Sequence, residues 1–307
     1  MRVYSHPACL SHEPGPGHPE CSARLEAVIS ALRSALPTLD WQQAPAATRE
    51  QIARVHTADH IATILDTVVT ETLRLDADTA LSASSAEAAL RAAGAGIAAV
   101  DWVLTGKNRR AFCAVRPPGH HATHRTPMGF CLFNSVAVAA AHALKAHGLE
   151  RVSIVDFDVH HGNGTQDIFQ RDLRVQYLSS HQIPLYPNTG RSDEHGVGNI
   201  HNAELPPGSG APVFRSVWSN TLLPIIDAFE PQLILISAGF DAHRLDPLAD
   251  LRLEAEDYAW ISTELGRLAD AHSQGRLVSL LEGGYSLTAL RECSVAHVRA
   301  LASPASP

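Results

Sequence analysis

The chain has 307 residues, of which 45% are hydrophobic and 18% charged, and its formal net charge at pH 7 is −8. This composition is typical of a soluble globular protein and excludes disordered, collagenous and coiled-coil classes. An acidic chain without Lys/Arg runs lacks the charge pattern of a nucleic-acid-binding protein. No apolar run approaches the roughly 18 residues of a membrane span, so we expect neither direct nucleic-acid binding nor a membrane.

The five cysteines are odd in number, widely spaced and never arranged as Cys-x-x-Cys. This pattern favours a reducing compartment over a disulfide scaffold or a cysteine zinc site. The N-terminus has no apolar core of a signal peptide. Together these features predict a cytoplasmic protein. The length allows one large domain or two ordinary ones, and we expect one domain over residues 1–307.

From about residue 85 the sequence alternates between helical and strand-like patterns, whereas residues 5–80 are less regular and are expected to form a helical, loop-rich edge of the same domain. The predicted helices cover residues 86–104, 134–147, 166–169, 214–229, 254–272 and 286–301. The predicted strands cover residues 111–115, 151–155, 175–178, 233–237 and 277–281. Because these strands are mostly apolar, we expect an α/β fold: a central, mostly parallel sheet with helices on both faces.

Four of the predicted strands are followed directly by polar, mostly titratable residues. These clusters cover residues 116–121, 156–164, 238–243 and 282–285. In open α/β sheets, ligands bind outside the carboxyl ends of the strands. The four clusters are therefore expected to converge on one crevice.

Two of the clusters carry a candidate metal site. In an extended segment Asp156, Asp158 and His160 point the same way, and Asp241 follows another strand. Carboxylates and one imidazole, with no thiol, suit zinc or a similar divalent metal, and three protein ligands leave a position open for water and substrate. Taken alone, residues 156–160 could equally form a buried polar loop whose histidine caps a helix.

Candidate catalytic groups accompany this site. His120 and His121 follow Pro-Pro-Gly, and an imidazole there could take a proton from water and return it to a leaving amine. Asp156 and Asn163 are candidate partners that would fix the ring tautomers. Tyr285, after a Gly-Gly pair, could donate a hydrogen bond to an oxyanion. The alternatives are two loop histidines and a surface tyrosine.

Five motifs, in this order, resemble those of the histone deacetylase superfamily: residues 116–121, 128–131, 156–164, 239–241 and 282–285. His18-Pro19-Glu20 with Arg24 is similar to the class II and bacterial deacetylase-like amidohydrolase branch. The resemblance covers about residues 5–300. It implies an arginase-like α/β fold and a zinc-dependent amidohydrolase that releases acetate from acetylated amines, with acetyl-lysine side chains of proteins or peptides as the expected substrate.

The resemblance also implies roles for individual residues. The matched metal ligands are Asp158, His160 and Asp241. His121 matches the general base and acid, His120 its companion histidine, and Asp156 the carboxylate that orients His120. Asn163 stands beside the second histidine, where some relatives have Asp, and Tyr285 matches the tyrosine that stabilises the transition state.

Substrate contacts follow in the same way. Phe130, after Gly129, matches one aromatic wall of the acetyl-lysine tunnel, and Leu185 or Tyr186 is a candidate for the other wall. Leu248 stands where acetylpolyamine-selective relatives carry Glu, and an apolar residue there disfavours a cationic polyamine. Asp78 is a candidate for holding the substrate backbone.

The cofactors implied are one Zn²⁺ per chain, with Fe²⁺ also compatible with the ligand set, and a structural K⁺. The K⁺ site matches Asp156, Asp158, His160, Ser179 and Ser180, largely through backbone carbonyls. The alternatives are an amidohydrolase acting on acetylpolyamines or other small acetylamides, a ureohydrolase, which would need a second metal in this site, and a non-catalytic acetyl-lysine-binding scaffold. The sequence leaves homo-oligomerisation open.

Overall fold

A computed structural model describes residues 1–106 and 109–303. Its centre is an 8-stranded sheet in the order β2-β1-β5-β10-β9-β6-β7-β8, in which every neighbouring pair is parallel. The strands are β1 (Arg2–Ser5), β2 (Asp40–Gln43), β5 (Arg110–Cys113), β6 (Val152–Asp156), β7 (Val175–Gln182), β8 (Ile200–Leu205), β9 (Leu233–Ala238) and β10 (Leu277–Leu281). A separate antiparallel pair joins β3 (Leu73–Arg74) to β4 (Ala80–Leu81).

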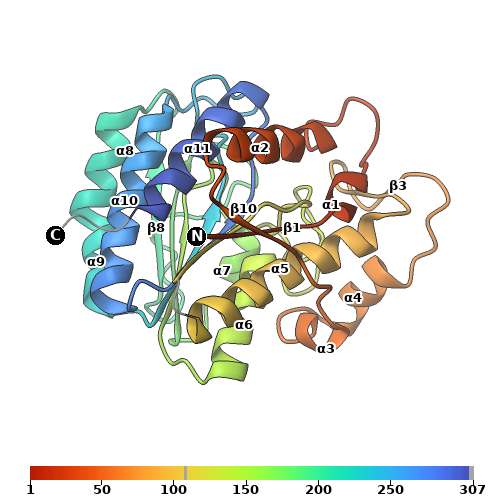
Figure 1. The fold of residues 1–307 in the computed structure, drawn as a ribbon, viewed down its shortest axis with the longest axis horizontal. Coiled ribbons are helices and arrows are strands. Elements are labelled where there is room, and N and C mark those ends of the chain that lie inside the picture. Colours follow the sequence, from red (N-terminus) through yellow and green to blue (C-terminus); the bar gives the residue numbers. More distant parts are fainter. Residues whose placement is uncertain (107–108, 304–307) are drawn as a thin grey trace.

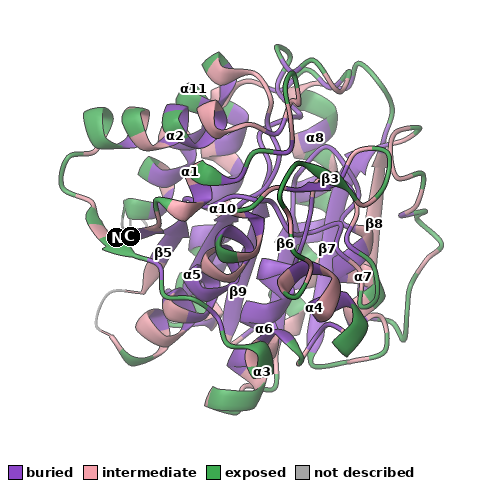
Figure 2. Cartoon of the chain, turned by 90° about the vertical axis from the view of Figure 1, so that its right-hand side faces the viewer, coloured by how far each residue is buried: buried purple, intermediate pink, exposed green. Residues whose placement is uncertain are grey.

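Helices cover both faces of the sheet (Figure 1). One layer contains α2 (Ser22–Ala35), α8 (Ala211–Val217), α9 (Leu223–Phe229), α10 (Ala255–His272) and α11 (Leu287–Ala302). The other contains α5 (Ser85–Thr105), α6 (Ser135–His147) and α7 (Asn163–Phe169), and the short helices are α1 (Ala8–Ser11), α3 (Arg49–Ile52) and α4 (Ala58–Leu65). Strands β6, β7 and β9 are buried along their whole length (Figure 2), and so is β10. The predicted α/β architecture is therefore confirmed.

Three strands of the sheet were not predicted: β1, β2 and β8. Strands β2 and β8 form the two edges of the sheet. At least half of the residues in each of their sequences, Asp-Trp-Gln-Gln and Ile-His-Asn-Ala-Glu-Leu, are polar. An edge strand meets solvent, so it lacks the continuous apolar run that marks a central strand of a parallel sheet. Strand β7 extends beyond the predicted residues 175–178 because it pairs with β8 as far as Gln182.

The predicted helix over residues 214–229 begins earlier, at Ala211, and changes register in the middle. A π-helical turn, η1 (Trp218–Leu222), separates α8 from α9. Pro224 lies in the first turn of α9 and has no N–H to donate to the carbonyl four residues earlier. The π-helical turn accommodates this missing hydrogen bond.

The sequence led us to expect no apolar segment long enough to span a membrane, and helix α5 is an exception to this expectation. By length and composition it is apolar enough to cross one, and 61% of the apolar stretch is buried inside the protein. The helix packs against α6, β1, β5 and β10. Its apolar composition is therefore accounted for by its place in the core.

The packing of α5 predicts the effect of adding one methyl group. A Cβ at Gly94 would overlap the carbonyl oxygen of Pro45 and come within 2.8 Å of the Ala47 nitrogen. Alanine is favoured over glycine in a helix by about 1 kcal/mol, but overpacking typically costs ~1–3 kcal/mol, and backbone atoms cannot rotate away. We expect Gly94→Ala to lower the free energy of unfolding, measured by urea denaturation, by about 1 kcal/mol or more.

Gly96→Ala in the same helix is the matched control. Its Cβ would meet Ala139 Cβ at 3.1 Å and Leu280 Cδ2 at 3.2 Å. The Ser135 carbonyl oxygen would lie 3.3 Å away. Because none of these contacts is shorter than 3.1 Å, the neighbours need to move only slightly, and the loss of stability should be smaller. An unchanged stability of Gly94→Ala, or a larger loss in Gly96→Ala, would contradict this packing.

Candidate metal centre and active site

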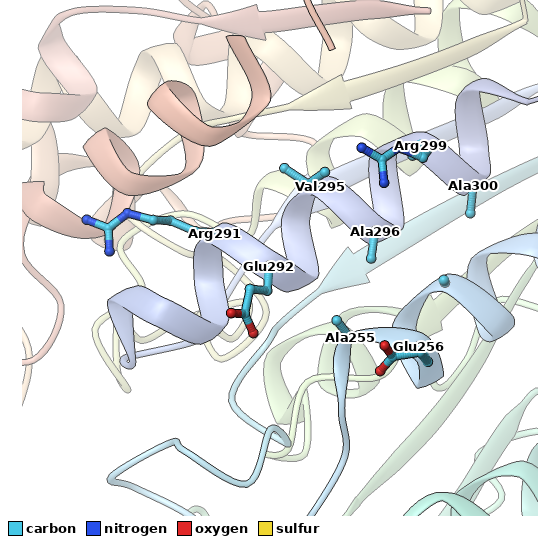
Figure 3. A pocket seen from close by; sticks show the side chains of 9 residues that line it. Ala255, Glu256, Arg291, Glu292, Val295, Ala296, Arg299 and Ala300 are labelled. Carbon is cyan, nitrogen blue, oxygen red and sulfur yellow. The ribbon is translucent and has the colours of Figure 1, made fainter. Parts of the chain in front are cut away.

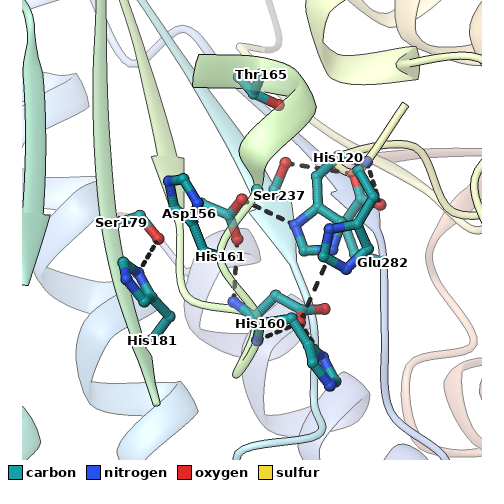
Figure 4. Close-up of polar contacts among 12 residues, drawn as sticks. His120, Asp156, His160, His161, Thr165, Ser179, His181, Ser237 and Glu282 are labelled. Carbon is teal, nitrogen blue, oxygen red and sulfur yellow. Dashed lines mark hydrogen bonds and ion pairs between the residues drawn. The ribbon is translucent and has the colours of Figure 1, made fainter. Parts of the chain in front are cut away.

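The four polar clusters meet because their strands are consecutive in the sheet. β5, β10, β9 and β6 are neighbours in that order and all run parallel. Their carboxyl ends therefore share one edge. Figure 4 shows His120, Ser237, Glu282, Asp156 and His160, which come from the ends of these four strands, grouped around one point. The structure thus brings together the clusters that the sequence singled out.

Asp158, His160 and Asp241 are buried, and one ligand atom from each lies within 4.8 Å of the others. His160 Nδ1 is 3.1 Å from Asp158 Oδ1 and 3.2 Å from Asp241 Oδ2. Asp241 Oδ2 makes no hydrogen bond within the described residues. A buried carboxylate oxygen without a hydrogen-bond donor is costly, and a cation between these side chains would satisfy it. The residues present therefore fit a divalent metal ion.

The backbone holds both carboxylates in place. The Gly283 amide donates to Asp158 Oδ2 at 2.9 Å, and the Val159 amide donates to Asp241 Oδ1 at 2.9 Å. A Cβ at Gly239 would overlap the Asp158 carboxylate, and one at Gly283 would overlap that of Asp241. Glycine at these two positions leaves the space that the two carboxylates occupy.

The adjacent histidines have different partners and opposite pKa shifts. His120 Nδ1 lies 3.0 Å from Asp156 Oδ2, and His121 Nδ1 lies 2.8 Å from Asn163 Oδ1. Burial alone would lower the pKa of His120, but the carboxylates of Asp156 and Asp158 raise it to about 10. Burial and the neighbouring charge on His120 hold the pKa of His121 well below its ordinary value. His121 is therefore neutral: Nδ1–H donates to Asn163, and the Nε2 lone pair is free.

Glu282 belongs to a motif that the sequence identified, but its contacts could not be foreseen. Its Oε2 accepts hydrogen bonds from the backbone amides of Gly119 (2.6 Å) and His120 (3.2 Å), and Ser237 Oγ donates to Oε1. Burial raises the pKa of Glu282 to about 7. The side chain thus fixes the backbone that carries the two histidines. The signal in the sequence is an acidic residue directly after a mostly apolar strand, where a buried carboxyl needs partners.

Tyr285 is held from two sides. Its backbone amide donates to Asp246 Oδ2 at 2.7 Å. Arg24 donates to the carbonyl of Gly284 at 2.5 Å, and its guanidinium lies 4.7 Å from the centre of the Tyr285 ring. Arg24 is in turn paired with Glu20, Nη1 to Oε1 2.9 Å. The motif near the N-terminus therefore supports the turn that carries the phenol.

Aromatic rings flank the crevice. The Phe130 ring lies 5.7 Å from that of Tyr285, and the Tyr186 ring lies 5.2 Å from that of His121. Leu185 packs against the hydrophobic core instead. Of the two candidates for the second wall, Tyr186 is the one beside the histidines. Gly129 has a φ of 56°, and a Cβ there would come within 2.5 Å of the His121 ring.

The remaining predicted substrate contacts lie around this crevice. Asp78 and Phe130 line a cavity of about 510 Å³ together with the loop over residues 14–19. Leu248 is half-buried, and its amide donates to Asp246 Oδ1 at 3.0 Å, so it is tied to the carboxylate that also holds Tyr285.

Three residues of the expected K⁺ site lie on adjacent strands, whereas Asp158 and His160 lie in the loop that follows β6. Asp156 on β6 is in register with Ser179 on β7, and Ser180 follows. Ser179 Oγ is 2.9 Å from His181 Nδ1, whereas Ser180 Oγ accepts from Trp218 Nε1 at 3.0 Å. The two serine hydroxyls are therefore engaged with protein groups.

A groove of about 590 Å³ lies on the outer surface between α10 and α11 (Figure 3). It is lined by alanines with Glu256, Arg291, Glu292 and Arg299 at its sides. No residue of the metal centre or of the histidine pair lines it. The groove is therefore separate from the candidate active site.

Comparisons with known proteins agree with this geometry. Residues 18–301 match the model of the histone deacetylase domain. Histone deacetylase 14, chloroplastic, of Arabidopsis thaliana is 39% identical over 323 residues, covering 97% of this chain and 76% of the relative. The histone deacetylase-like amidohydrolase of Pseudomonas aeruginosa is 36% identical over 300 residues, covering 96% of this chain and 78% of that protein. The crystal structure of the HDA15 HD domain superposes with a TM-score of 0.92 at 36% identity, covering 98% of this chain and 90% of that one.

One expectation from the sequence is corrected by these comparisons. The absence of a signal-peptide pattern and the cysteine usage predicted a cytoplasmic location. The plant relative is named chloroplastic, which contradicts that prediction. Cysteine spacing reports redox conditions and does not distinguish one reducing compartment from another, so the cytoplasmic assignment does not stand.

The close approach of Gly283 to both carboxylates predicts how the metal centre responds to one methyl group. A Cβ there would overlap Asp241 Oδ2 and reach 2.5 Å from Asp158 Oδ2, so Gly283→Ala must displace one carboxylate or both. We expect the Kd of the tightest zinc site, measured by competition with a chromogenic chelator, to rise about 10–100-fold, as when groups that orient metal ligands are removed. Gly210→Ala is the control, because its Cβ would lie 3.4 Å from the nearest atom. Unchanged zinc affinity in Gly283→Ala would argue against these ligands.

Proposed function

The chain belongs to the histone deacetylase family of hydrolases, and we propose that it hydrolyses acetyl-lysine side chains of proteins or peptides and releases acetate. The observation that carries this proposal is His121, a neutral imidazole with Nδ1 bonded to Asn163 at 2.8 Å, among the carboxylates and histidine of the metal centre. A general base must be unprotonated and fixed in one tautomer to accept a proton from water.

Asp158, His160 and Asp241 are the residues that would hold the metal, for which we propose Zn²⁺. When bound, such an ion supplies Lewis acidity, which polarises a carbonyl and makes a water more acidic. We also propose K⁺ near the backbone of Asp156 and Ser179, in keeping with the family resemblance. The hydrolytic chemistry itself is then carried by the protein groups around the crevice.

Two side chains perform the proton transfer and the charge stabilisation. His121 Nε2 accepts the proton from water as its oxygen attacks the acetyl carbonyl, and returns that proton to the departing lysine amine. The Tyr285 phenol donates a hydrogen bond to the oxygen that becomes negative in the tetrahedral state. Burial raises the pKa of Tyr285 well above its ordinary value, so the phenol keeps the proton that it donates.

The rim of the crevice supports a peptide as substrate. The cavity of about 510 Å³ is lined by Phe130 and by the loops that contain His18 and Asp78. Residues flanking an acetyl-lysine would lie there, whereas a small acetylated amine has no part to place in it. The apolar Leu248 supports the same substrate, because it offers nothing to a cationic chain.

A specific observation favours a second candidate, an acetylpolyamine. Asp78 lines the cavity at the rim, and its backbone amide donates to Asp76 Oδ1 at 2.9 Å. Burial and the neighbouring carboxylate of Asp76 raise the pKa of Asp78. Two carboxylates in one place attract a polycation. Hydrolysis of acetylspermidine in preference to a peptide would support this candidate.

Removal of the Tyr285 hydroxyl tests the proposed chemistry. Loss of one oxyanion donor typically lowers kcat by about 10²–10³, and Tyr285→Phe keeps the ring that packs against Phe130 and Arg24. We expect a fall of this size in kcat for an acetyl-lysine peptide, with zinc content and Tm unchanged. Retention of most of the rate would remove Tyr285 from the mechanism.

The substrate class is tested by filling the cavity at the rim. Ala77 is exposed and lines it, so Ala77→Trp should raise KM for acetyl-lysine peptides while turnover of isolated acetyl-lysine stays unchanged. Ala46→Trp, at an exposed position outside this cavity, is the matched control. Equal KM values for the two Trp variants would show that flanking residues do not bind there. If the wild-type protein hydrolysed neither the peptide nor isolated acetyl-lysine, the proposed function would be contradicted.

A further inference from the structure

A second group of metal-binding side chains joins α5 to α6 at a distance from the active site. It consists of Asp101 on α5 and of His142 and His147 on α6. The two helices pack against each other over much of their length (Figure 1). We propose that these three side chains bind a divalent transition metal, with zinc as the best-suited ion.

The three groups lie close enough together to share one ion. His142 Nε2 and His147 Nε2 each lie 2.7 Å from Asp101 Oδ1. The two imidazole rings are 5.5 Å apart, and the three ligand atoms lie within 4.8 Å of one another, the same limit that the buried site of Asp158, His160 and Asp241 meets. Two imidazoles and one carboxylate are a common ligand set for zinc, with water in the open position.

The site is open to ions from solution. The side chain of Asp101 is 50% exposed, that of His147 22% and that of His142 8%. Without a metal, both Nε2–H groups donate to the same carboxylate oxygen. In the metal-bound state the same three atoms turn their lone pairs to the ion. The helices need little rearrangement between these two states, which lowers the cost of binding.

Arg54 is the residue that opposes metal binding. Its Nη1 donates to His142 Nδ1 at 3.0 Å. A guanidinium has donors only, so this contact keeps the His142 proton on Nε2, the nitrogen that a metal needs. Binding therefore requires the proton to move to Nδ1 and Arg54 to leave. The displaced Arg54 guanidinium can pair with Glu50 instead, because Arg54 Nη2 already lies 4.0 Å from Glu50 Oε1.

The second site lies far from the reacting groups. Helix α6 begins next to Asn134, whose side chain contacts the loop of His120, and ends at His147. At 1.5 Å per residue, roughly 12 Å of helix separates Asn134 from His142 and roughly 20 Å separates it from His147. Removal of the second site should therefore leave the hydrolytic rate unchanged, and the proposal is independent of the substrate.

The test is a calorimetric zinc titration of protein that already carries one equivalent of zinc. The wild-type protein should bind a second equivalent, and its Tm should rise with zinc concentration because the ion binds the folded state. His147→Ala and Asp101→Asn should each weaken this second event at least about tenfold. The matched control is His272→Ala, because His272 also pairs with a single carboxylate, Asp227, at 2.7 Å but lacks a second histidine. His272→Ala should behave as the wild type.

Arg54→Gln separates a metal site from a simple hydrogen-bonded cluster. A metal-binding histidine commonly donates its other ring N–H to a carbonyl or carboxylate oxygen, and the glutamine carbonyl could accept from His142 Nδ1–H in this way. Zinc affinity should therefore increase about tenfold. Absence of a second bound equivalent in the wild type, or its persistence in both His147→Ala and Asp101→Asn, would overturn the proposal. Each variant should still carry the first equivalent of zinc as the wild type does, which would show that the variant is folded.

Discussion

The crowding of negative charge at one edge of the sheet is the constraint on which the rest of the site depends. Asp156, Asp158, Asp241 and Glu282 are all buried there. Burial raises the pKa of Asp156, Asp241 and Glu282. Carboxylates taken out of water are stable only when paired with positive charge or with several donors. The edge must therefore attract protons, cations or both.

The protein meets this demand in two ways. Backbone amides donate to Asp158, Asp241 and Glu282. The nearby carboxylates raise the pKa of His120 and of His160 to about 10 in each case, against the effect of burial. The charge on His120 then lowers the pKa of His121. In this way a surplus of carboxylates produces one charged and one neutral histidine side by side, and it leaves Asp241 Oδ2 available for a metal.

The sequence was sufficient for those parts of the protein that depend on local pattern. Apolar strands identified the centre of the sheet, and the parallel arrangement implied that residues 156–164 and 282–285 would meet. Edge strands β2 and β8 lack such a pattern. The contact of Arg24 with Gly284 joins positions 260 residues apart, and only the folded chain shows it. The same holds for Asp101, whose partners His142 and His147 become neighbours through the packing of α5 on α6.

Acetate release from a peptide with a single acetyl-lysine tests the central claim most directly, because it requires the metal centre, the histidines and the crevice together. The measurement compares zinc-loaded protein, the same protein after chelation, and the chelated protein with zinc restored. We expect turnover to be lost on chelation and recovered with zinc. Turnover that survives complete removal of the metal, or no turnover with the metal bound at Asp158, His160 and Asp241, would contradict the account.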